Sequence, residues 1–259
     1  MAHERVTDPD DPRLADYVDL RHRRVVAGGP VFVEGLIAIG ELIGSGYPIR
    51  SILVTPAKAE RLPPLPPGTT VLVADLDVQR PTVGFDLHRG AIASADRVPL
   101  PDVESLVDPP GRRTLLVTER LGDLENLGSL FRNARAFGVD GVLLDPETTD
   151  PLHRRVVRVS MGHSLRVPYA RIERWPAVLR ELDYEVVALT PGGTPIGEWN
   201  PGERVAFLVG AEGPGLTDAA LAAASHRLRI PMAPEVDSVN VATAAAIALS
   251  ARFGGNLTR

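Results

Sequence analysis

Short apolar runs alternate with helix-like patterns along the second half of the chain. Strands are expected at residues 114–119, 140–145, 185–190, 204–210 and 227–232. Helices are expected at residues 125–138, 152–161, 175–182, 217–224 and 238–253, where apolar residues recur at helical spacing. Apolar strands that alternate with helices are typical of a mostly parallel sheet covered on both faces. The pattern therefore predicts an α/β domain.

The first half of the chain shows a smaller α/β pattern. Strands are expected at 51–55, 70–75 and 90–95, and a helix is expected at 35–46, where it ends at glycine. A stretch rich in proline and aspartate follows at 99–114 and is the expected linker. The sequence therefore predicts two domains, residues 1–108 and residues 109–259. The first shows no catalytic constellation.

Composition narrows the classes of protein that fit. The 259 residues are 44% hydrophobic and 24% charged, which is ordinary for a globular protein. The chain has no cysteine, which excludes disulfides, thiolate metal sites and cysteine nucleophiles. No apolar run approaches the roughly 20 residues of a membrane span, and the polar N-terminus lacks an apolar signal core. We expect a soluble cytoplasmic protein with neither a membrane nor a metal as partner.

The charge pattern leaves two interpretations open. The net charge of −5 does not favour a nucleic-acid partner, although local basic patches decide that question more than net charge does. Every basic residue except Lys58 is an arginine. Arginine pairs with phosphate through two parallel hydrogen bonds and stacks on bases, so the bias suits RNA. A GC-rich genome would produce the same bias.

Ligands of parallel sheets bind in the loops that follow the strands, so three such loops are candidates. The first, at 121–139, opens a helix whose core stripe comprises Leu127, Leu130, Phe131, Ala134 and Phe137. Arg132 and Arg135 fall outside this stripe and face either solvent or a partner. Asn126 stands at the helix start, where it serves either as a cap or in chemistry.

The second loop reads LVGAEGPGL from Leu208 to Leu216. Its glycines let the backbone approach a ligand closely, and Glu212 adds one carboxylate. The spacing matches neither the dinucleotide fingerprint nor a P-loop. The third loop reads IPMAPEVDSVN, and its Asp237, Ser238 and Asn240 precede the last helix. These residues cap the helix, and the same helix start could bind an adenosine-bearing ligand through backbone N–H groups.

Together the three loops resemble the three motifs of the SpoU (TrmH-type) RNA 2′-O-ribose methyltransferases, a branch of the SPOUT superfamily. Asn126 and Arg132 match the asparagine and arginine of the first motif, and Gly210 and Glu212 match the second. The run IPMAPEVDSVNVATAAAIAL is similar to the third motif, and VVRVSMGHSLRVPY to the segment between the first two.

Two letters of the third motif depart from the family pattern. Val239 stands where the family has leucine, at a position expected to line the adenine pocket, and Ala242 stands where it has a second serine. Residues 18–55 are similar, more loosely, to the ribosomal-protein-like RNA-binding domain that precedes many family members.

The resemblance implies a fold, a cofactor and partners. The expected fold is an α/β trefoil-knot domain with a mostly parallel sheet, preceded by a small α/β RNA-binding domain. The expected partners are a second copy of the chain and structured RNA, ribosomal rather than transfer RNA by analogy with the first domain. S-adenosylmethionine is expected in the knot, bound by Leu208, Gly210, Ile230, Met232 and Val239.

The same resemblance assigns the reacting groups. The expected catalytic residues are Arg132, Asn126, Glu212, Ser238 and Asn240. The family pattern has Arg132 reaching into the partner's site. A guanidinium stays protonated, so Arg132 is expected to hold a phosphate and stabilise developing alkoxide charge rather than to remove a proton. Glu212 would order its loop or act on the substrate.

Two further function classes stay in view. A non-catalytic RNA-binding protein could keep the same fold, although the presence of Arg132, Glu212, Ser238 and Asn240 argues against it. A small-molecule enzyme with a nucleotide cofactor could use an ordinary doubly wound sheet. The missing dinucleotide fingerprint and P-loop argue against that class.

Overall fold

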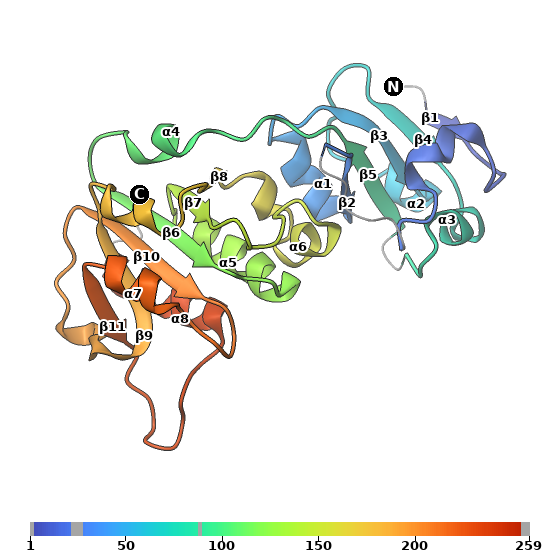
Figure 1. The fold of residues 1–259 in the computed structure, drawn as a ribbon. Coiled ribbons are helices and arrows are strands. Elements are labelled where there is room, and N and C mark those ends of the chain that lie inside the picture. The colour runs from blue at the N-terminus through green and yellow to red at the C-terminus, as the bar shows by residue number, and fades with distance from the viewer. Residues whose placement is uncertain (1–2, 22–27, 88–89, 255–259) are drawn as a thin grey trace. The chain divides into compact units, whose positions relative to one another are not determined.

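The computed structural model describes residues 3–21, 28–87 and 90–254 (Figure 1). The chain forms two compact units. Unit 1 comprises Met1–Pro99 and Pro151–Arg166, and unit 2 comprises Leu100–Asp150 and Val167–Arg259. Residues 22–27, part of the region that resembles an RNA-binding domain, lie outside the described residues. Across the described ranges, no helix is both long enough and apolar enough to cross a membrane.

Unit 1 is built on a mixed five-stranded sheet in the order β1-β4-β3-β5-β2. The strands β1, β4 and β3 run parallel, whereas β5 is antiparallel to both β3 and β2. The elements are β1 (His3–Arg5), β2 (Val31–Glu34), α1 (Leu36–Ile43), β3 (Ile49–Val54), α2 (Pro56–Ala59), β4 (Thr70–Val73), α3 (Leu76–Val83), β5 (Ala91–Ala95) and α6 (Arg154–Val159), with 3-10 turns at Pro12–Tyr17 and His163–Leu165. The predicted strands β3, β4 and β5 and the predicted helix α1 are confirmed.

Helix α6 belongs to unit 1 although it lies far along the chain. Arg154 forms an ion pair with Glu34, which is 6% exposed. The Arg154 guanidinium also lies 4.1 Å from the centre of the Phe85 ring. A buried carboxylate needs a paired charge, so this contact stabilises the attachment of α6 to β2. Gly162, which follows α6, packs closely on α1, because a Cβ on Gly162 would lie 3.0 Å from the Cα of Ala38.

Unit 2 is built on a six-stranded sheet in the order β11-β9-β10-β6-β7-β8. Every neighbouring pair is parallel, as the sequence predicts. The elements are α4 (Val103–Val107), β6 (Arg113–Glu119), α5 (Leu124–Ala136), β7 (Gly141–Leu144), β8 (Tyr169–Arg171), β9 (Glu185–Pro195), β10 (Arg204–Gly210), α7 (Asp218–Ala223), β11 (His226–Arg229) and α8 (Val241–Phe253), with 3-10 turns at Ala177–Arg180 and Ile196–Glu198.

Contacts near both ends of helix α8 hold it in place. Phe253 stacks on Phe137 with ring centres 6.4 Å apart, and Asn133 of α5 donates to the Ala242 carbonyl at 2.8 Å. Near the C-terminal end, Arg252 is 2% exposed and donates to the carbonyls of Gly202 and Glu203. Burial lowers the pKa of Arg252. These bonds hold α8 against the sheet and so set where its first residue lies.

Several predicted boundaries are wrong, each for a local reason. The strand expected to reach Met232 ends at Arg229, because Pro231 has no N–H to donate to the sheet. The last helix begins at Val241 rather than Ser238 because Asn240 caps it. The helix expected at 175–182 is only a 3-10 turn, Ala177–Arg180, which suits a short connection after a proline.

The expected linker also contains structure. Helix α4 lies within 99–114, where the Asp102 carboxylate accepts from the Ser105 N–H at 2.8 Å and so caps it. Leu106 is 6% exposed and packs in the core of unit 2. Strands β1, β2 and β8 were not predicted. All three residues of β1 are exposed, and all four of β2 are buried, so neither shows an alternating pattern.

Candidate functional site

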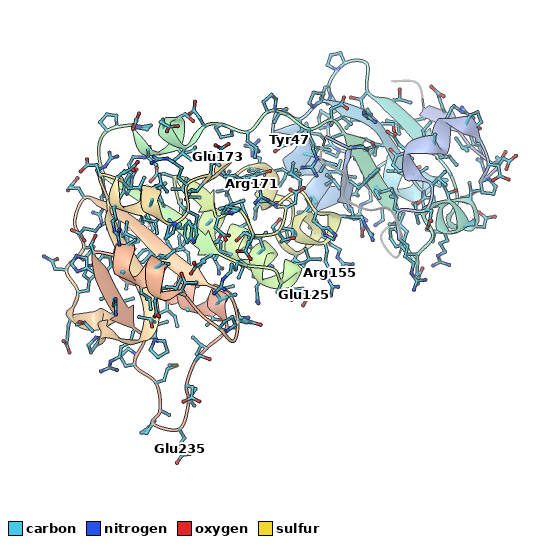
Figure 2. All side chains as sticks on the ribbon, in the orientation of Figure 1. Tyr47, Glu125, Arg155, Arg171, Glu173 and Glu235 are labelled. Carbon is cyan, nitrogen blue, oxygen red and sulfur yellow. The ribbon has the colours of Figure 1, made fainter. Side chains whose placement is uncertain are left out.

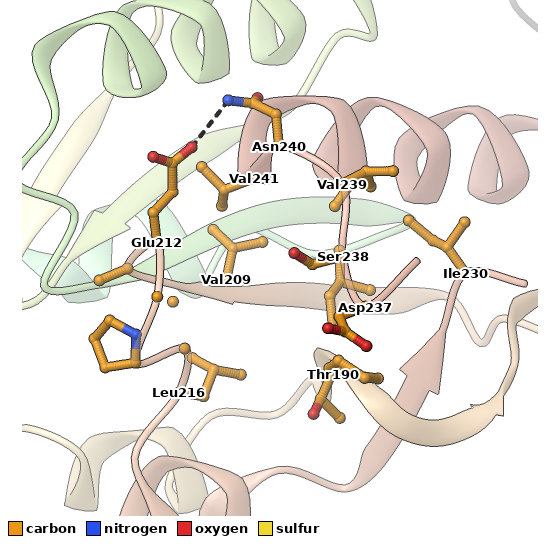
Figure 3. A pocket seen from close by; sticks show the side chains of 18 of the residues that line it. Thr190, Val209, Glu212, Leu216, Ile230, Asp237, Ser238, Val239, Asn240 and Val241 are labelled. Carbon is orange, nitrogen blue, oxygen red and sulfur yellow. Dashed lines mark hydrogen bonds between the residues drawn. The ribbon is translucent and has the colours of Figure 1, made fainter. Parts of the chain in front are cut away.

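Three loops of unit 2 enclose a cavity of about 550 Å³ (Figure 3). They follow or interrupt β9, β10 and β11, which are neighbours in the sheet. The carboxyl ends of neighbouring parallel strands meet at one edge of a sheet, so these loops meet there too. The lining residues are Leu189–Pro191, Val209–Leu216, Leu228, Ile230, Met232, Asp237–Val241 and Ala244.

The loop after β10 is shaped by its glycines. A Cβ on Gly210 would lie 2.5 Å from the carbonyl carbon of Gly215, so no larger residue fits there without moving the chain. Gly213 and Gly215 have φ values of 83° and 67°, which L side chains rarely adopt. The Gly215 N–H donates to the Ala211 carbonyl at 3.0 Å and closes the turn. The loop thus forms a tight wall whose backbone faces the cavity.

Glu119 secures the end of this wall. It ends β6, pairs in register with Gly210, and is 1% exposed. Its carboxylate accepts from the N–H and the hydroxyl of Thr217, at 2.8 and 2.7 Å, and from the Trp175 indole N–H at 2.9 Å. Thr217 in turn caps α7. The sequence analysis missed Glu119, although a charged residue that ends an apolar strand was a usable signal.

Asn240 stands at the centre of the site. Its side-chain oxygen accepts from the N–H groups of Ala242 and Thr243, at 2.9 and 3.3 Å, and so caps α8. Its amide nitrogen donates to the side-chain oxygen of Asn126 at 2.7 Å and to Glu212 at 3.1 Å (Figure 3). One side chain therefore caps a helix and joins residues of all three motifs.

Asn126 is free for this contact because it is not the cap of α5. Asp123 has that role, since its carboxylate accepts from the N–H groups of Glu125 and Asn126 at 2.9 and 2.8 Å. Asn126 itself is 7% exposed. The interpretation of Asn126 as a cap is therefore wrong, and its side chain is directed to Asn240 instead.

Arg132 lies apart from the cavity. Arg132 is six positions after Asn126, which corresponds to about 9 Å along a helix and about 240° around it. Arg132 and Arg135 are both exposed, as the helical pattern predicts. Arg132 does not line the cavity, and its side chain forms no hydrogen bond or ion pair with another described residue.

The structure brings most of the candidate residues together. Of those expected to bind the cofactor, Gly210, Ile230, Met232 and Val239 line the cavity. Leu208 instead packs in the core of unit 2, and its neighbour Val209 faces the cavity. Of those expected to be catalytic, Glu212, Ser238 and Asn240 line the cavity, and Asn126 reaches it through Asn240.

The sequence analysis missed one wall of the cavity. Strand β9 pairs with β11 through Ala188 and then through Thr194, so residues 189–193 bulge out of the sheet between these pairs. Leu189, Thr190 and Pro191 of this bulge line the cavity. Pro191 followed by two glycines was the available signal, because such a run seldom continues a regular strand.

The family departures fall where they can be tolerated. Val239 is 37% exposed and lines the cavity, so it meets a ligand with a smaller apolar side chain than leucine. Ala242 is 3% exposed and uses only its backbone, as acceptor from Asn133 and donor to Asn240. Its packed position leaves a serine hydroxyl no evident task in this chain.

The ionisable groups that line the cavity are Glu212 and Asp237. No lysine, arginine or histidine is among its described lining residues. The described residues also contain no cluster of histidine, aspartate and glutamate that could hold a metal ion. The cavity is therefore mainly apolar and carries a negative charge.

The chain is similar to known RNA methyltransferases. The model of the SpoU rRNA Methylase family matches residues 113–250. An uncharacterized tRNA/rRNA methyltransferase of Mycobacterium tuberculosis is 43% identical over 95% of this chain and 90% of its own length. The 23S rRNA (guanosine-2′-O-)-methyltransferase RlmB of Ralstonia nicotianae is 29% identical over 70% of this chain and 76% of its own length.

A solved structure shows the same architecture. The AdoMet-bound rRNA methyltransferase from Sinorhizobium meliloti has a TM-score of 0.82 and 26% identity, covering 98% of this chain and 99% of that one. The likeness confirms the predicted fold class, an α/β trefoil-knot methyltransferase domain with a smaller α/β domain before it. With the family model matching more than half of the sequence, the chain belongs to the SpoU rRNA methylase family.

Proposed function

We propose that this protein transfers a methyl group from S-adenosylmethionine to a ribose 2′-hydroxyl in ribosomal RNA. The observation that carries the proposal is the cavity of about 550 Å³ that the second and third motifs line at the strand ends. In support, the Sinorhizobium meliloti structure holds AdoMet, and the Ralstonia nicotianae relative is named for 2′-O-methylation of guanosine in 23S rRNA.

The cavity fits the cofactor by size and chemistry. Its volume lies in the usual range for small-molecule sites, about 300–1,000 Å³, and its lining is mostly apolar with few polar groups. Gly210 lets the loop close tightly against Gly215, which a side chain at this position would prevent. Gly210, Ile230, Met232 and Val239 would hold the cofactor, with Leu208 supporting it from the core side of β10. When bound, the cofactor supplies a methyl group on a sulfonium.

The polar residues would align the ribose. Asn240 is held by its cap bonds and by Asn126, so its amide has a fixed direction toward Glu212 and the cavity. Ser238 lines the same wall. We assign Asn126 to the positioning of Asn240, and Glu212, Ser238 and Asn240 to contact with the ribose or its loop. Holding the hydroxyl in line with the methyl would lower the barrier by fixing the two reacting groups in the geometry of attack.

Arg132 would serve the cavity of a second copy of the chain. In support, it is exposed and does not line the cavity of its own chain. Its guanidinium would bind the phosphate next to the reacting ribose and stabilise developing alkoxide charge, while the proton of the 2′-hydroxyl leaves to that phosphate or to water. This role requires a homodimer, which we therefore include in the proposal.

The chain would divide its work between its two halves. We assign RNA binding to residues 1–108 and methyl transfer to residues 109–259, in the cytoplasm, where ribosomal RNA is processed. The attachment of α6 to unit 1 supports a link between the RNA-binding half and the segment that follows the first motif.

Mapping 2′-O-methyl marks in total RNA tests the function directly. RNA from cells with and without the gene is compared by a method that detects 2′-O-methylation at each nucleotide. We expect one mark or a few marks in ribosomal RNA to disappear without the gene and to return with a plasmid copy. An unchanged map would overturn the proposal. Binding of both cofactor and RNA without any transfer would instead favour a non-catalytic RNA-binding protein.

A further inference from the structure

The cavity carries a negative charge that no basic group in its lining offsets. Glu212 and Asp237 are the ionisable residues among its described lining residues, and both are acidic. They do not play the same part. Glu212 accepts from Asn240 at 3.1 Å, whereas Asp237 is exposed and forms no hydrogen bond or ion pair with any other described residue.

Asp237 is not needed to cap the helix that follows it. The sequence pattern placed it among the capping residues of α8, but Asn240 alone provides the side-chain cap. Asp237 and Thr190 both line the cavity, and Figure 3 draws them on the side away from the hydrogen bond between Glu212 and Asn240. The Asp237 carboxylate is therefore available to a ligand.

The methyl donor and its product differ in charge. At neutral pH S-adenosylmethionine carries a sulfonium, an ammonium and a carboxylate, whereas S-adenosylhomocysteine has a neutral thioether in place of the sulfonium. The two ligands share the same adenosine and nearly the same shape. Salt screens the interaction of exposed charges beyond the Debye length, about 8 Å at physiological salt. A carboxylate closer than this to the sulfonium therefore distinguishes the two ligands by charge.

We propose that Asp237 makes the cavity selective for the cationic methyl donor over the neutral product. This inference rests on the proposed function, because it concerns the same cavity. Asp237 is a specificity-determining residue, and its charge favours exchange of product for fresh donor after each transfer. The side chain is exposed, so the effect is that of a surface ion pair, about three- to fivefold in affinity.

Titration calorimetry on the full chain tests the proposal. The ligands are S-adenosylmethionine, S-adenosylhomocysteine and sinefungin, which carries an ammonium group in place of the methylated sulfonium. We expect Asp237→Asn to lower the affinity for S-adenosylmethionine and sinefungin about three- to fivefold. The affinity for S-adenosylhomocysteine should change less than about 1.5-fold. Asp237→Glu, which keeps the charge, should keep the preference.

Glu235→Gln is the matched control. Glu235 lies on the same loop, is exposed, and does not line the cavity, and Figure 2 shows it at the tip of the loop. It should leave all three affinities unchanged. Raising the salt to about 0.5 M should reduce the preference of the natural protein.

The outcomes separate this inference from the proposed function. Equal weakening of all three ligands by Asp237→Asn, or no weakening of the cationic pair, would overturn the role of Asp237. If the natural protein bound none of the three ligands, the proposed function itself would fail.

Discussion

The site has a buried frame and an exposed working surface, and they are built differently. The buried Glu119 and Asn126 and the half-buried Gly210 form the frame, where hydrogen bonds and tight backbone contacts leave little freedom. Arg132, Asp237 and Ser238 belong to the exposed surface, with Asn240 joining the two. The frame should therefore govern stability and cofactor binding together, whereas the surface should govern rate and selectivity with little effect on folding.

Replacing Arg132 should give the largest loss of methyl-transfer rate and should leave cofactor affinity and stability unchanged. We expect Arg132→Ala to lower the rate of methyl transfer about 100- to 1000-fold, as removal of a charge-stabilising donor does. Cofactor affinity and thermal stability should stay unchanged, because Arg132 is exposed and lies outside the cavity. Single-turnover assays and calorimetry measure the two quantities.

Arg135→Ala is the control on the same exposed face of α5. If Arg132 serves a second copy, mixing Arg132→Ala with Asn240→Ala, which we also expect to lose turnover, should recover part of the activity in mixed dimers. Equal losses of cofactor affinity and turnover would contradict the assigned role.

Replacing Glu119 should give the largest loss of stability. Glu119→Ala leaves three half-buried donors, on Thr217 and Trp175, without their acceptor. An unsatisfied buried donor costs about 1–3 kcal/mol and a half-buried donor costs less because water reaches it, so we expect the free energy of unfolding to fall by about 2 kcal/mol. Urea denaturation measures this, with Glu235→Ala as the exposed control. A change below about 0.5 kcal/mol, the usual size for surface substitutions, would show that Glu119 is not part of a frame.

Substitutions of Asn240 should separate the two tasks of that residue. Asn240→Ala removes the cap of α8 and should cost about 1 kcal/mol of stability as well as turnover. Asn240→Asp keeps an oxygen for the N–H groups of Ala242 and Thr243 but cannot donate to Asn126 or Glu212. It should therefore fold nearly as well as the natural protein and still lose turnover. Full activity of Asn240→Asp would restrict Asn240 to the cap.

Replacing Val239 with leucine, the residue usual in the family, should give the smallest effect, a change in cofactor affinity. Val239→Leu adds one methylene where the side chain lines the cavity and is 37% exposed. A buried methylene contributes about 0.8 kcal/mol, so the affinity for S-adenosylmethionine should rise by at most about fourfold. Calorimetry checks this. A marked loss of affinity would mean that the cavity is shaped around valine.

The sequence predicted the parts of the site that are local and missed the parts that depend on register. The motif letters located Gly210, Glu212 and Asn240 because each lies next to a strand end or helix start that the apolar pattern marks. The bonds from Glu119 to Thr217 and from Asn133 to Ala242 join residues far apart in sequence. No pattern of spacing reveals such pairs.

Two further differences come from how short patterns are read. The bulge of β9 looked like the end of a strand at Thr190, because Pro191 normally interrupts pairing, yet the strand resumes at Thr194 opposite Leu228. Asn126 looked like a cap because asparagine favours helix starts, but Asp123 stands three residues earlier and takes that place. The first error concealed Leu189, Thr190 and Pro191, which line the cavity.

A transfer assay with methyl-labelled S-adenosylmethionine tests the central claim most directly. The purified protein is incubated with ribosomal RNA from cells that lack the gene, and the product is digested with alkali. A methyl group on the 2′-oxygen blocks alkaline cleavage of the next phosphodiester, so the account predicts label in alkali-resistant dinucleotides. Label released as mononucleotides, or no label at all, would contradict it.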